Sequence, residues 1–498
     1  MPFPRPNAHH CRSAALALAS AGTLAASLTA CSTPGRPAPD LAALYDQPAQ
    51  ALGPDRTPVV VIPGILGSRL VDTDTRQVVW GAFTYGAADP DFPDGARAVA
   101  LPFAHNRPLA DSRDRVEPDG VLDELIANVG PLRVSALQPY RGILLSLSAG
   151  RYTDRDLATA GEARRRTTHP PDPAQGPVDY AGQHFTCFQF DYDWRRDLSE
   201  HAQRLDLLIQ AAARLAHAAR NAPADAEPPR VDVVAHSMGG LVLMYYLRFG
   251  TQPLPDDGSV PPVTWAGARR IRHAVLVGTP SAGSVLALRQ LVEGVNYSPI
   301  TPTYQPAVLG TMPAVFQLMP RARHARVIDA ATKQPVDPTD PAVWRRYRWG
   351  LADPAQRDYL AWLLPGVPDP AVRQRIALAH LDRVLARTRQ LQAALDQPAP
   401  PLPPGCDLRL FAGDSESTPD LLEVDPATGR LRVASTAPGD GTVTRASALL
   451  DERAGTSFSP TLRTPIPWSN VHFLHADHIA LTDTPEFTDN LLFLLLER

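Results

Sequence analysis

A serine with the setting of a nucleophile stands in the segment VDVVAHSMGGLV, which runs from Val231 to Val242. Ala235 to Gly239 match the motif G-x-S-x-G, with alanine in place of the first glycine. In this motif a strand turns sharply into a helix, and the turn presents the serine hydroxyl to a substrate. An apolar run precedes Ser237 and a helical stretch follows it. We therefore predict that Ser237 is a nucleophile, the alternative being a serine that only caps the helix.

Three histidines near the carboxyl end could be the base that this serine needs. A serine hydroxyl is a weak nucleophile unless a base takes its proton and a carboxylate orients that base. His478 begins a loop that leads into a final helix, so we predict His478, with His475 as the alternative. His472 lies in the apolar run VHFL, which indicates a core or strand position. His236 is too constrained by the serine turn to act as the base, and we expect it to support that turn.

Two aspartates could orient the base. Asp414, in the segment FAGDSES, directly follows an apolar run of strand type, which is the usual location of the acid. Asp440, in PGDGTVTRAS, lies between two glycines in a loop. Both fit the order serine, acid, histidine that accompanies this serine motif. The local sequence does not separate them.

Strands that alternate with helices must position these groups. Short runs rich in Val, Ile, Leu and Phe lack strict alternation, as expected for strands covered on both faces. They begin at Pro58, His184, Val231, Ile271 and Asp407. Helical stretches lie at residues 198–220, 241–249 and 487–496. This order predicts an α/β domain with a mostly parallel sheet and helices on both faces.

Two long insertions interrupt the alternation. The first, at about residues 70–135, carries Trp80 and other aromatic residues among glycines and prolines. The second, at about residues 284–404, contains a predicted helix at residues 372–395. Insertions of this size usually form a lid or a cap, the alternative being a second domain with its own core. We predict a single domain over residues 57–498 that follows a proline-rich linker at residues 31–56.

Residues 1–30 have the features of an export signal. Arg5 and Arg12 precede a weakly apolar stretch, and LTAC at residues 28–31 resembles the lipobox of bacterial lipoproteins. The resemblance implies that Cys31 is acylated and that the protein is held in the cell envelope by lipid. Ser32 favours the outer membrane, with the protein facing the periplasm or the surface. The alternative is an ordinary signal peptide with an incidental cysteine.

Charge and cysteine content restrict the remaining possibilities. The 498 residues carry a net charge of -4 and a single lysine, which gives no case for a nucleic acid partner. After the signal, only Cys187 and Cys406 remain, and both lie in or beside apolar runs. Export would allow a disulfide, but we expect two buried free thiols. The sequence does not indicate the oligomeric state.

Seven motifs, taken in order, resemble the lecithin:cholesterol acyltransferase family, which includes lysosomal phospholipases. They are PVVVIPGILGSRL at residues 58–70, FDYDWRRD at 190–197, VVAHSMGG at 233–240, VGTPSAGS at 277–284, MPAVFQLMP at 312–320, GDGTV at 439–443 and the tail from His478. The resemblance covers most of the chain after Pro58 and implies an α/β-hydrolase fold with lid and cap insertions. It also favours Asp440 as the acid and His478 as the base.

The same resemblance implies where a tetrahedral oxyanion would bind. Such an anion needs preorganised N–H donors. One would be the backbone of Met238, directly after the nucleophile, and the other the backbone of Ile65, in the turn after the first PG. Relatives often have a polar residue at the position of Ile65, but a change of side chain leaves the backbone donor in place.

Two further positions carry weaker expectations. Trp80 resembles a lid tryptophan that lies near acyl chains in relatives, the alternative being a packed loop aromatic. Asp193 and Arg195, in the motif DWR, are expected to pair and brace loops under the site instead of taking part in chemistry.

The resemblance implies a serine enzyme that needs no cofactor or metal. It would form an acyl-enzyme at Ser237 from a glycerophospholipid or a similar ester and pass the acyl group to an alcohol or to water. A second possibility is a lipase or esterase that acts on another hydrophobic ester. A third is a surface lipoprotein that binds lipid without catalysis.

Overall fold

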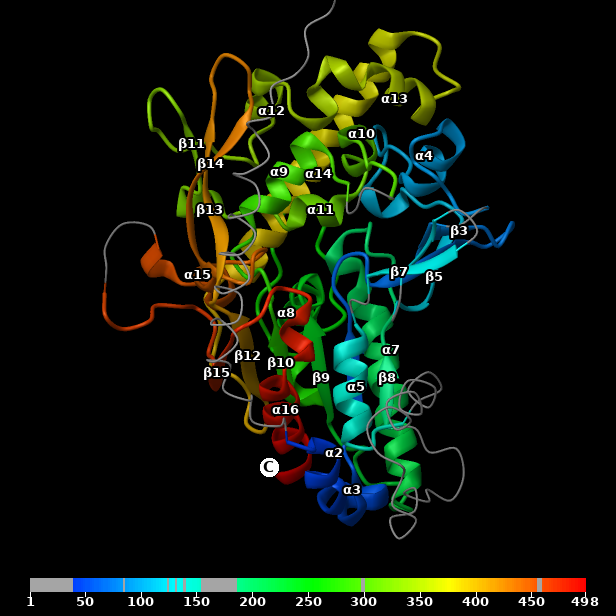
Figure 1. The fold of residues 1–498 in the computed structure, drawn as a ribbon, viewed down its shortest axis with the longest axis vertical. Helices are drawn as coiled ribbons and strands as arrows, with labels where there is room; N and C mark the ends of the chain where they lie inside the picture. The colour runs from blue at the N-terminus through cyan, green and yellow to red at the C-terminus, as the bar shows by residue number, and fades with distance from the viewer. Residues whose placement is uncertain are drawn as a thin grey trace, which may run out of the picture. The chain divides into compact units, whose positions relative to one another are not determined.

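A six-stranded parallel sheet forms the centre of the protein (Figure 1). The computed structural model describes residues 39–83, 86–122, 125–129, 132–137, 140–153, 186–296, 301–454 and 459–498, of which Leu41 onward form a compact unit. The strand order is β15-β12-β10-β9-β1-β8, and each adjacent pair is parallel. These strands are β1 (Val59–Ile62), β8 (Cys187–Gln189), β9 (Val231–His236), β10 (Ile271–Val277), β12 (Asp407–Gly413) and β15 (Asn470–Leu474).

The sheet separates two hydrophobic cores, as the sequence pattern predicted. Val59 and Val61 of β1 belong to one core, and Val60 and Ile62 belong to the other, because successive side chains of a strand point to opposite faces. Figure 1 shows α5 (Arg141–Ala149) and α16 (Pro485–Glu497) side by side over the first face. The second core includes α7 (Ala202–Ala219) and α8 (Met238–Phe249). The predicted α/β fold is confirmed.

The second half of the expected linker is helical. It forms α2 (Leu41–Leu44), α3 (Asp46–Leu52) and the 3-10 turn η2 (Gly53–Asp55). Leu41 and Tyr45 are buried in the core with α16, and the Tyr45 hydroxyl donates to the Asp489 carboxylate at 2.6 Å. Pro48 is the third residue of α3, where a backbone N–H has no partner within the helix, so this proline does not prevent the helix. The compact unit thus begins at Leu41, before the predicted boundary at residue 57.

The described part of the first insertion, here called the lid (residues 70–135), contains short strands, the helix α4 and the 3-10 turn η3. One three-stranded sheet has the order β3-β2-β5 and another the order β4-β6-β7. Buried lid residues such as Val79 and Val99 lie in the same hydrophobic cluster as Val60 of the central sheet. The elements are β2 (Ser68–Asp72), β3 (Val78–Trp80), β4 (Ala82–Phe83), α4 (Pro93–Val99), η3 (Leu109–Asp111), β5 (Val116–Val121), β6 (Leu125–Val129) and β7 (Leu132–Leu137).

The second insertion, here called the cap (residues 284–404), is mostly helical. Its buried residues, among them Leu351 and Leu385, also belong to the cluster that contains Val60, so the described cap shares the main core. Its longest element is α14 (Pro370–Asp396), which contains the helix predicted at residues 372–395. The others are α9 (Val285–Glu293), α10 (Pro306–Leu309), α11 (Pro313–Gln317), η6 (Ala322–His324), β11 (Val327–Asp329), α12 (Pro341–Tyr347), η7 (Gly350–Ala352), η8 (Pro354–Gln356) and α13 (Arg357–Leu363).

A third excursion, which the sequence analysis did not predict, follows β12. It is the antiparallel hairpin of β13 (Glu416–Val424) and β14 (Leu431–Gly439), and β11 of the cap pairs with β13 in parallel. The hairpin leads to α15 (Arg445–Leu449) through the segment that contains Asp440. The remaining elements are η4 (Leu198–His201), η5 (Ala268–Arg270), η9 (Glu452–Ala454) and η10 (Ala480–Asp483).

The structure tests the expected state of the two cysteines but not the expected export signal. Cys187 and Cys406 are buried and are not joined by a disulfide, as expected. The export signal and Cys31 lie outside the described residues. Within the described residues, no helix has both the length and the apolar character that crossing a bilayer requires.

Candidate active site

Ser237 lies on a strained turn between β9 and α8. Its backbone has φ 53° and ψ -125°, a conformation that residues other than glycine rarely adopt. The two glycines that follow Met238 are needed for close packing at this turn. A Cβ on Gly239 would lie 2.3 Å from the carbonyl oxygen of Pro63, and one on Gly240 would lie 1.9 Å from Oγ1 of Thr279. The turn therefore has the geometry that the motif predicted.

Ser237, His478 and Asp440 form a hydrogen-bonded row. Nε2 of His478 lies 2.9 Å from Oγ of Ser237, and Nδ1 lies 2.8 Å from Oδ2 of Asp440. Asp440 is 2% exposed, and its other carboxylate oxygen accepts from the backbone N–H groups of Thr442 and Val443 at 2.9 and 2.7 Å. Backbone N–H groups thus fix one carboxylate oxygen of Asp440, and the other oxygen holds the imidazole of His478. This arrangement directs Nε2 at the serine hydroxyl.

The surroundings of Asp440 keep its carboxylate ionised. Burial alone would raise its pKa, because desolvation disfavours the charged form. The charge of His478, its hydrogen bond and the two backbone N–H groups outweigh burial and hold the pKa below its usual value. An ionised Asp440 stabilises the Nδ1-protonated form of the ring and would stabilise an imidazolium if His478 accepted a proton.

Backbone hydrogen bonds also fix His478. Its N–H donates to the carbonyl oxygen of Asp440 at 2.8 Å, and its own carbonyl oxygen lies 2.9 Å from Nε2 of His236. Burial, and then the charge of His478, lower the pKa of His236 to about 3, so this ring is neutral near pH 7. A carbonyl oxygen can only accept a hydrogen bond, so the neutral His236 ring must carry its proton on Nε2. His236 therefore donates to the His478 loop, in the supporting position that we expected.

The alternative acid and base lie together, apart from the row. Asp414 is 3.7 Å from Nε2 of His475 and 3.2 Å from Arg445, and the His475 side chain is 83% exposed. His472 is a residue of β15, and its ring stacks on Phe411 at 4.7 Å. The structure thus brings Asp440 and His478, and not these alternatives, to Ser237.

The hairpin of β13 and β14 explains why Asp440, and not Asp414, takes the usual position of the acid after a strand. Asp414 follows β12 directly in sequence, but the hairpin returns the chain to the end of that strand. A Cβ on Gly413, the last residue of β12, would lie 2.6 Å from Cβ of Asp440. Asp440 therefore occupies the end of β12 in space, although 26 positions separate it from Asp414 in sequence.

The turn that contains Ile65 lies directly against the serine. A Cβ on Gly64 would be 2.8 Å from Cβ of Ser237. The N–H of Gly67 closes the turn by donating to the carbonyl oxygen of Gly64 at 3.2 Å. Met238, the other predicted donor, is the first residue of α8, and N–H groups in the first turn of a helix have no acceptor within it. Both predicted oxyanion donors therefore belong to backbone next to Ser237.

Three buried aromatic residues hold this turn in place. Tyr140 accepts from the N–H of Gly64 at 2.8 Å, and Tyr192 donates to the carbonyl oxygen of Pro63 at 2.8 Å. The indole N–H of Trp80 donates to the carbonyl oxygen of Leu66 at 2.7 Å. Sequence reasoning missed both contacts. Tyr140 stands outside the seven motifs, and Tyr192 belongs to FDYDWRRD, but nothing in that motif indicates a hydrogen bond to Pro63.

Trp80 is therefore a packed residue in this structure. It is 2% exposed, and its ring meets Phe83, Trp194 and Tyr304 edge to face, each with centroids 5.6 Å apart. This position fits the alternative of a packed loop aromatic. A contact between Trp80 and an acyl chain stays a prediction.

Asp193 and Arg195 pair as expected. The buried guanidinium of Arg195 donates to Asp193 at 2.9 and 2.8 Å, and it also reaches Asp114 and the carbonyl oxygen of Val99 in the lid. The N–H of Ala314 in the cap donates to the carbonyl oxygen of Arg195 at 3.3 Å. This pair connects the lid, the cap and the loop after β8.

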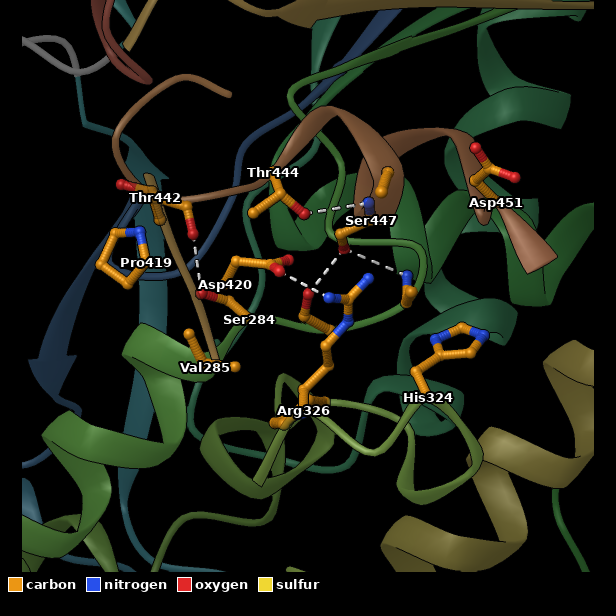
Figure 2. Close-up of a pocket in the computed structure, with 14 residues that line it drawn as sticks. Ser284, Val285, His324, Arg326, Pro419, Asp420, Thr442, Thr444, Ser447 and Asp451 are labelled. Carbon is orange, nitrogen blue, oxygen red and sulfur yellow. Dashed lines mark hydrogen bonds and ion pairs between the residues drawn. The ribbon is translucent and has the colours of Figure 1, made fainter. Parts of the chain in front are cut away.

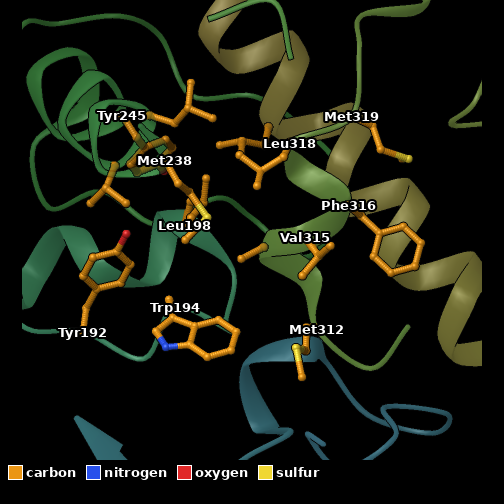
Figure 3. Packing of buried hydrophobic residues seen from close by; sticks show 14 of the residues in the cluster. Tyr192, Trp194, Leu198, Met238, Tyr245, Met312, Val315, Phe316, Leu318 and Met319 are labelled. Atoms are coloured by element: carbon orange, nitrogen blue, oxygen red, sulfur yellow. The ribbon is translucent and has the colours of Figure 1, made fainter. Parts of the chain in front are cut away.

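Apolar side chains fill the space around Met238 (Figure 3). Trp194, Leu198 and Met238 approach from the central domain, and Met312 and Val315 approach from the cap near α11. The chain has five methionines, and the four after Met1 are all buried in the main core to which these side chains belong. Methionine is flexible and adapts to irregular partners. Ser237 itself is only 8% exposed, so most of this residue is shielded from solvent.

A small polar cavity lies behind the Asp440 segment (Figure 2). It is lined by residues that include Ser284, Thr442 and Ser447, and its volume of about 20 Å³ holds roughly one water molecule. Ser284 donates to the carbonyl oxygen of Thr442 at 2.7 Å, and Ser447 donates to that of Gly283 at 2.6 Å. The cavity is too small for an ester substrate. Its walls support the loop that carries Asp440.

Fold and site together define a protein with the α/β-hydrolase fold. The family model described as "Lecithin:cholesterol acyltransferase" matches residues 182–351, a segment that contains Ser237. The resemblance that the motifs indicated is thereby confirmed over that segment. No group of three or more metal-ligand side chains occurs among the residues that the structure describes.

Comparison with solved structures supports the fold. A chain of the structure described as "The crystal structure of Tle4-Tli4 complex" superposes with a TM-score of 0.51 at 16% identity, over 88% of this chain and 98% of that chain. Lipase 1 from Pelosinus fermentans matches at 15% identity over 55% of this chain and 74% of its own. Its TM-score of 0.24 is too low to support a common fold. No curated protein matches significantly.

Proposed function

We propose that the protein is a serine-dependent ester hydrolase or acyltransferase. The observation that carries this proposal is the row in which His478 lies 2.9 Å from Ser237 and 2.8 Å from Asp440. Ser237 attacks the acyl carbonyl while His478 takes its proton, and Asp440 holds the ring and stabilises the imidazolium. His478 then returns the proton to the leaving alcohol, which gives an acyl-enzyme. An alcohol or water, deprotonated by the same histidine, releases the acyl group.

The backbone N–H groups of Ile65 and Met238 are proposed to bind the oxyanion. Both lie beside Ser237, and a donor set is effective when it is fixed before the reaction. The aromatic hydrogen bonds to residues 63–66 supply that rigidity for the turn of Ile65. The side chain of Ile65 does not enter this step.

A glycerophospholipid is the proposed acyl donor, by similarity to the matched family. The apolar side chains around Met238 offer a lining for an acyl chain, but they are packed together and Ser237 is only 8% exposed. The cap near α11 must therefore move before a long acyl chain can reach the serine. Other hydrophobic esters remain the alternative substrate class.

Envelope location through an acylated Cys31 is also a proposal. It would place the enzyme beside membrane lipid, which is the substrate that we propose. Growth with a labelled fatty acid should label the wild-type protein and not the Cys31→Ser variant. Equal labelling of both would contradict the anchor and leave the ester chemistry untouched.

The decisive experiment follows the acyl group of a labelled phospholipid. Purified protein should release it as free fatty acid, or as a new ester when an alcohol is added, and Ser237→Ala should abolish both while folding normally. A serine-directed phosphonate should label wild type only. Turnover confined to other esters would favour the lipase alternative. Absence of both turnover and labelling would overturn the enzyme proposal.

A further inference from the structure

A second cavity lies on the cap, between α13 and α14. Its volume is about 630 Å³, within the usual range of small-ligand sites. Three arginines line it, Arg345, Arg357 and Arg373, and none of the ten lining residues is acidic. Leu360 and Leu378 contribute an apolar floor. The cavity shares no residue with the row of Ser237, His478 and Asp440.

Two of these arginines carry charges that no carboxylate compensates within the described residues. Arg373 donates to the carbonyl oxygens of Val367 and Pro368, at 2.8 and 2.9 Å, and Arg357 makes no ion pair there. Arg345, in contrast, donates to both carboxylate oxygens of Asp382 at 2.6 and 2.7 Å. The cavity therefore has the electrostatics of an anion site.

The acidic residues closest in sequence do not cancel this charge at the cavity. Asp353 and Asp369 cap helices by accepting from the backbone N–H groups of Ala355 and Ala371, at 2.9 and 2.8 Å. Asp358 is exposed on α13 and is not among the lining residues. An incoming anion would thus meet arginines, the amide of Gln374 and apolar side chains at the lining of the cavity.

An uncharged apolar segment borders the cavity. Residues 359–368 read YLAWLLPGVP, and Trp362 and the two leucines after it are only partly buried. The helix α13 packs against α4 of the lid, and Arg97 donates to the carbonyl oxygen of Trp362 at 3.1 Å (Figure 1). Phe92, at the start of α4, is 63% exposed. Tryptophan and tyrosine beside exposed apolar residues are typical of surfaces that meet the membrane interface.

We propose that this surface, made of the cavity, residues 359–368 and Phe92, docks the protein on a membrane that contains anionic phospholipid. The guanidinium groups of Arg357 and Arg373 bind the headgroup phosphate, for which planar guanidinium donors are well suited. Leu378 faces the glycerol and the first methylene groups, while the partly buried and exposed side chains of residues 361–368 enter the interface. This binding does not depend on chemistry at Ser237.

Vesicle sedimentation tests the proposal. The full chain would carry Ser237→Ala to prevent turnover and Cys31→Ser to remove the proposed lipid. Vesicles of phosphatidylcholine alone would be compared with vesicles that also contain phosphatidylglycerol. We expect tighter binding to the anionic vesicles, and a loss of about five-fold for each of Arg357→Gln and Arg373→Gln. Phe92→Ser should weaken binding to both kinds of vesicle.

Matched controls distinguish docking at this surface from a folding defect and from nonspecific electrostatic attraction to the vesicles. Arg214→Gln removes an exposed arginine on α7 that has no ion pair in the described chain, and it should bind vesicles as well as the parent does. Unchanged melting temperatures would show that the cap variants fold. The proposal is overturned if Arg357→Gln and Arg373→Gln bind like Arg214→Gln, or if inorganic phosphate occupies the site while neither vesicle binds.

Discussion

Two aspartate–histidine pairs lie near the carboxyl ends of β12 and β15, and they differ in burial. In the pair of Asp440 and His478 the two side chains are 1% and 11% exposed and meet at 2.8 Å. In the pair of Asp414 and His475 they are 19% and 83% exposed and approach only to 3.7 Å. Backbone N–H groups fix the first aspartate, whereas the second shares its charge with Arg445. Burial and backbone contacts, more than residue type, therefore distinguish a positioned pair from a surface pair.

The largest expected difference between the pairs is catalytic. Asp440→Asn keeps the shape of the side chain but removes the charge that holds the Nδ1-protonated ring, so kcat for ester turnover should fall by about 10⁴-fold. Asp414→Asn should change kcat by less than about two-fold, since exposed pairs contribute little. Steady-state kinetics on one ester substrate would measure both. A larger loss in Asp414→Asn would reverse the assignment.

Support of the His478 loop by His236 should have a smaller effect. His236→Phe removes the donor to the His478 carbonyl oxygen, and the resulting shift of the imidazole should lower kcat by up to about a hundred-fold with little change in KM. His236→Gln, which can still donate, should recover much of this loss. His475→Phe is the matched control and should behave like wild type. If His236→Phe raised KM and left kcat unchanged, this positioning role would be contradicted.

The pKa of Asp440 predicts a further, smaller difference in the pH dependence of stability. Because its folded-state pKa lies below the unfolded value of about 3.9, its ionised form stabilises the fold above that pH. This contribution is lost as the pH falls through the folded-state pKa. The free energy of unfolding of Asp440→Asn should therefore decrease less steeply than that of wild type on acidification below about pH 5. Urea unfolding over a pH series would test this, and parallel curves would contradict it.

The smallest effect is expected from removing the surface pair altogether. Asp414→Ala combined with His475→Ala should change the free energy of unfolding by no more than about 1 kcal/mol, because solvent screens such pairs. Thermal and urea unfolding at neutral pH would measure the change. A clearly larger loss would mean that this pair, and not burial alone, holds the ends of the strands together.

The sequence predicted the central sheet well because its strands are covered on both faces. Each of the five predicted apolar runs contains a strand, and β10 begins at Ile271, where its run begins. The turn at Ser237 was also predictable, since only small residues fit around it. Local sequence patterns were sufficient to predict the structure wherever burial and steric limits act on residues that are neighbours in sequence.

The choice between Asp414 and Asp440 required information that local sequence does not contain. A hairpin returns the chain to the end of β12, and this is a tertiary fact that the residues beside each aspartate do not show. Family resemblance favoured Asp440, and the structure places that residue against His478. The support of residues 63–66 by Tyr140 and Tyr192 was missed for the same reason.

The pairing of β11 with β13 restricts how the cap can open. Residues Val327–Asp329 of the cap are joined strand to strand with the hairpin that ends at Gly439, directly before Asp440. A rigid rotation of the whole cap would therefore pull on the carboxylate that orients His478. The start of α9 is tied to the same loop, because Ser284 donates to the carbonyl oxygen of Thr442. Access to Ser237 without disturbance of the acid therefore requires hinges between α9 and Val327, so that α10 and α11 move while α9 and β11 remain in place.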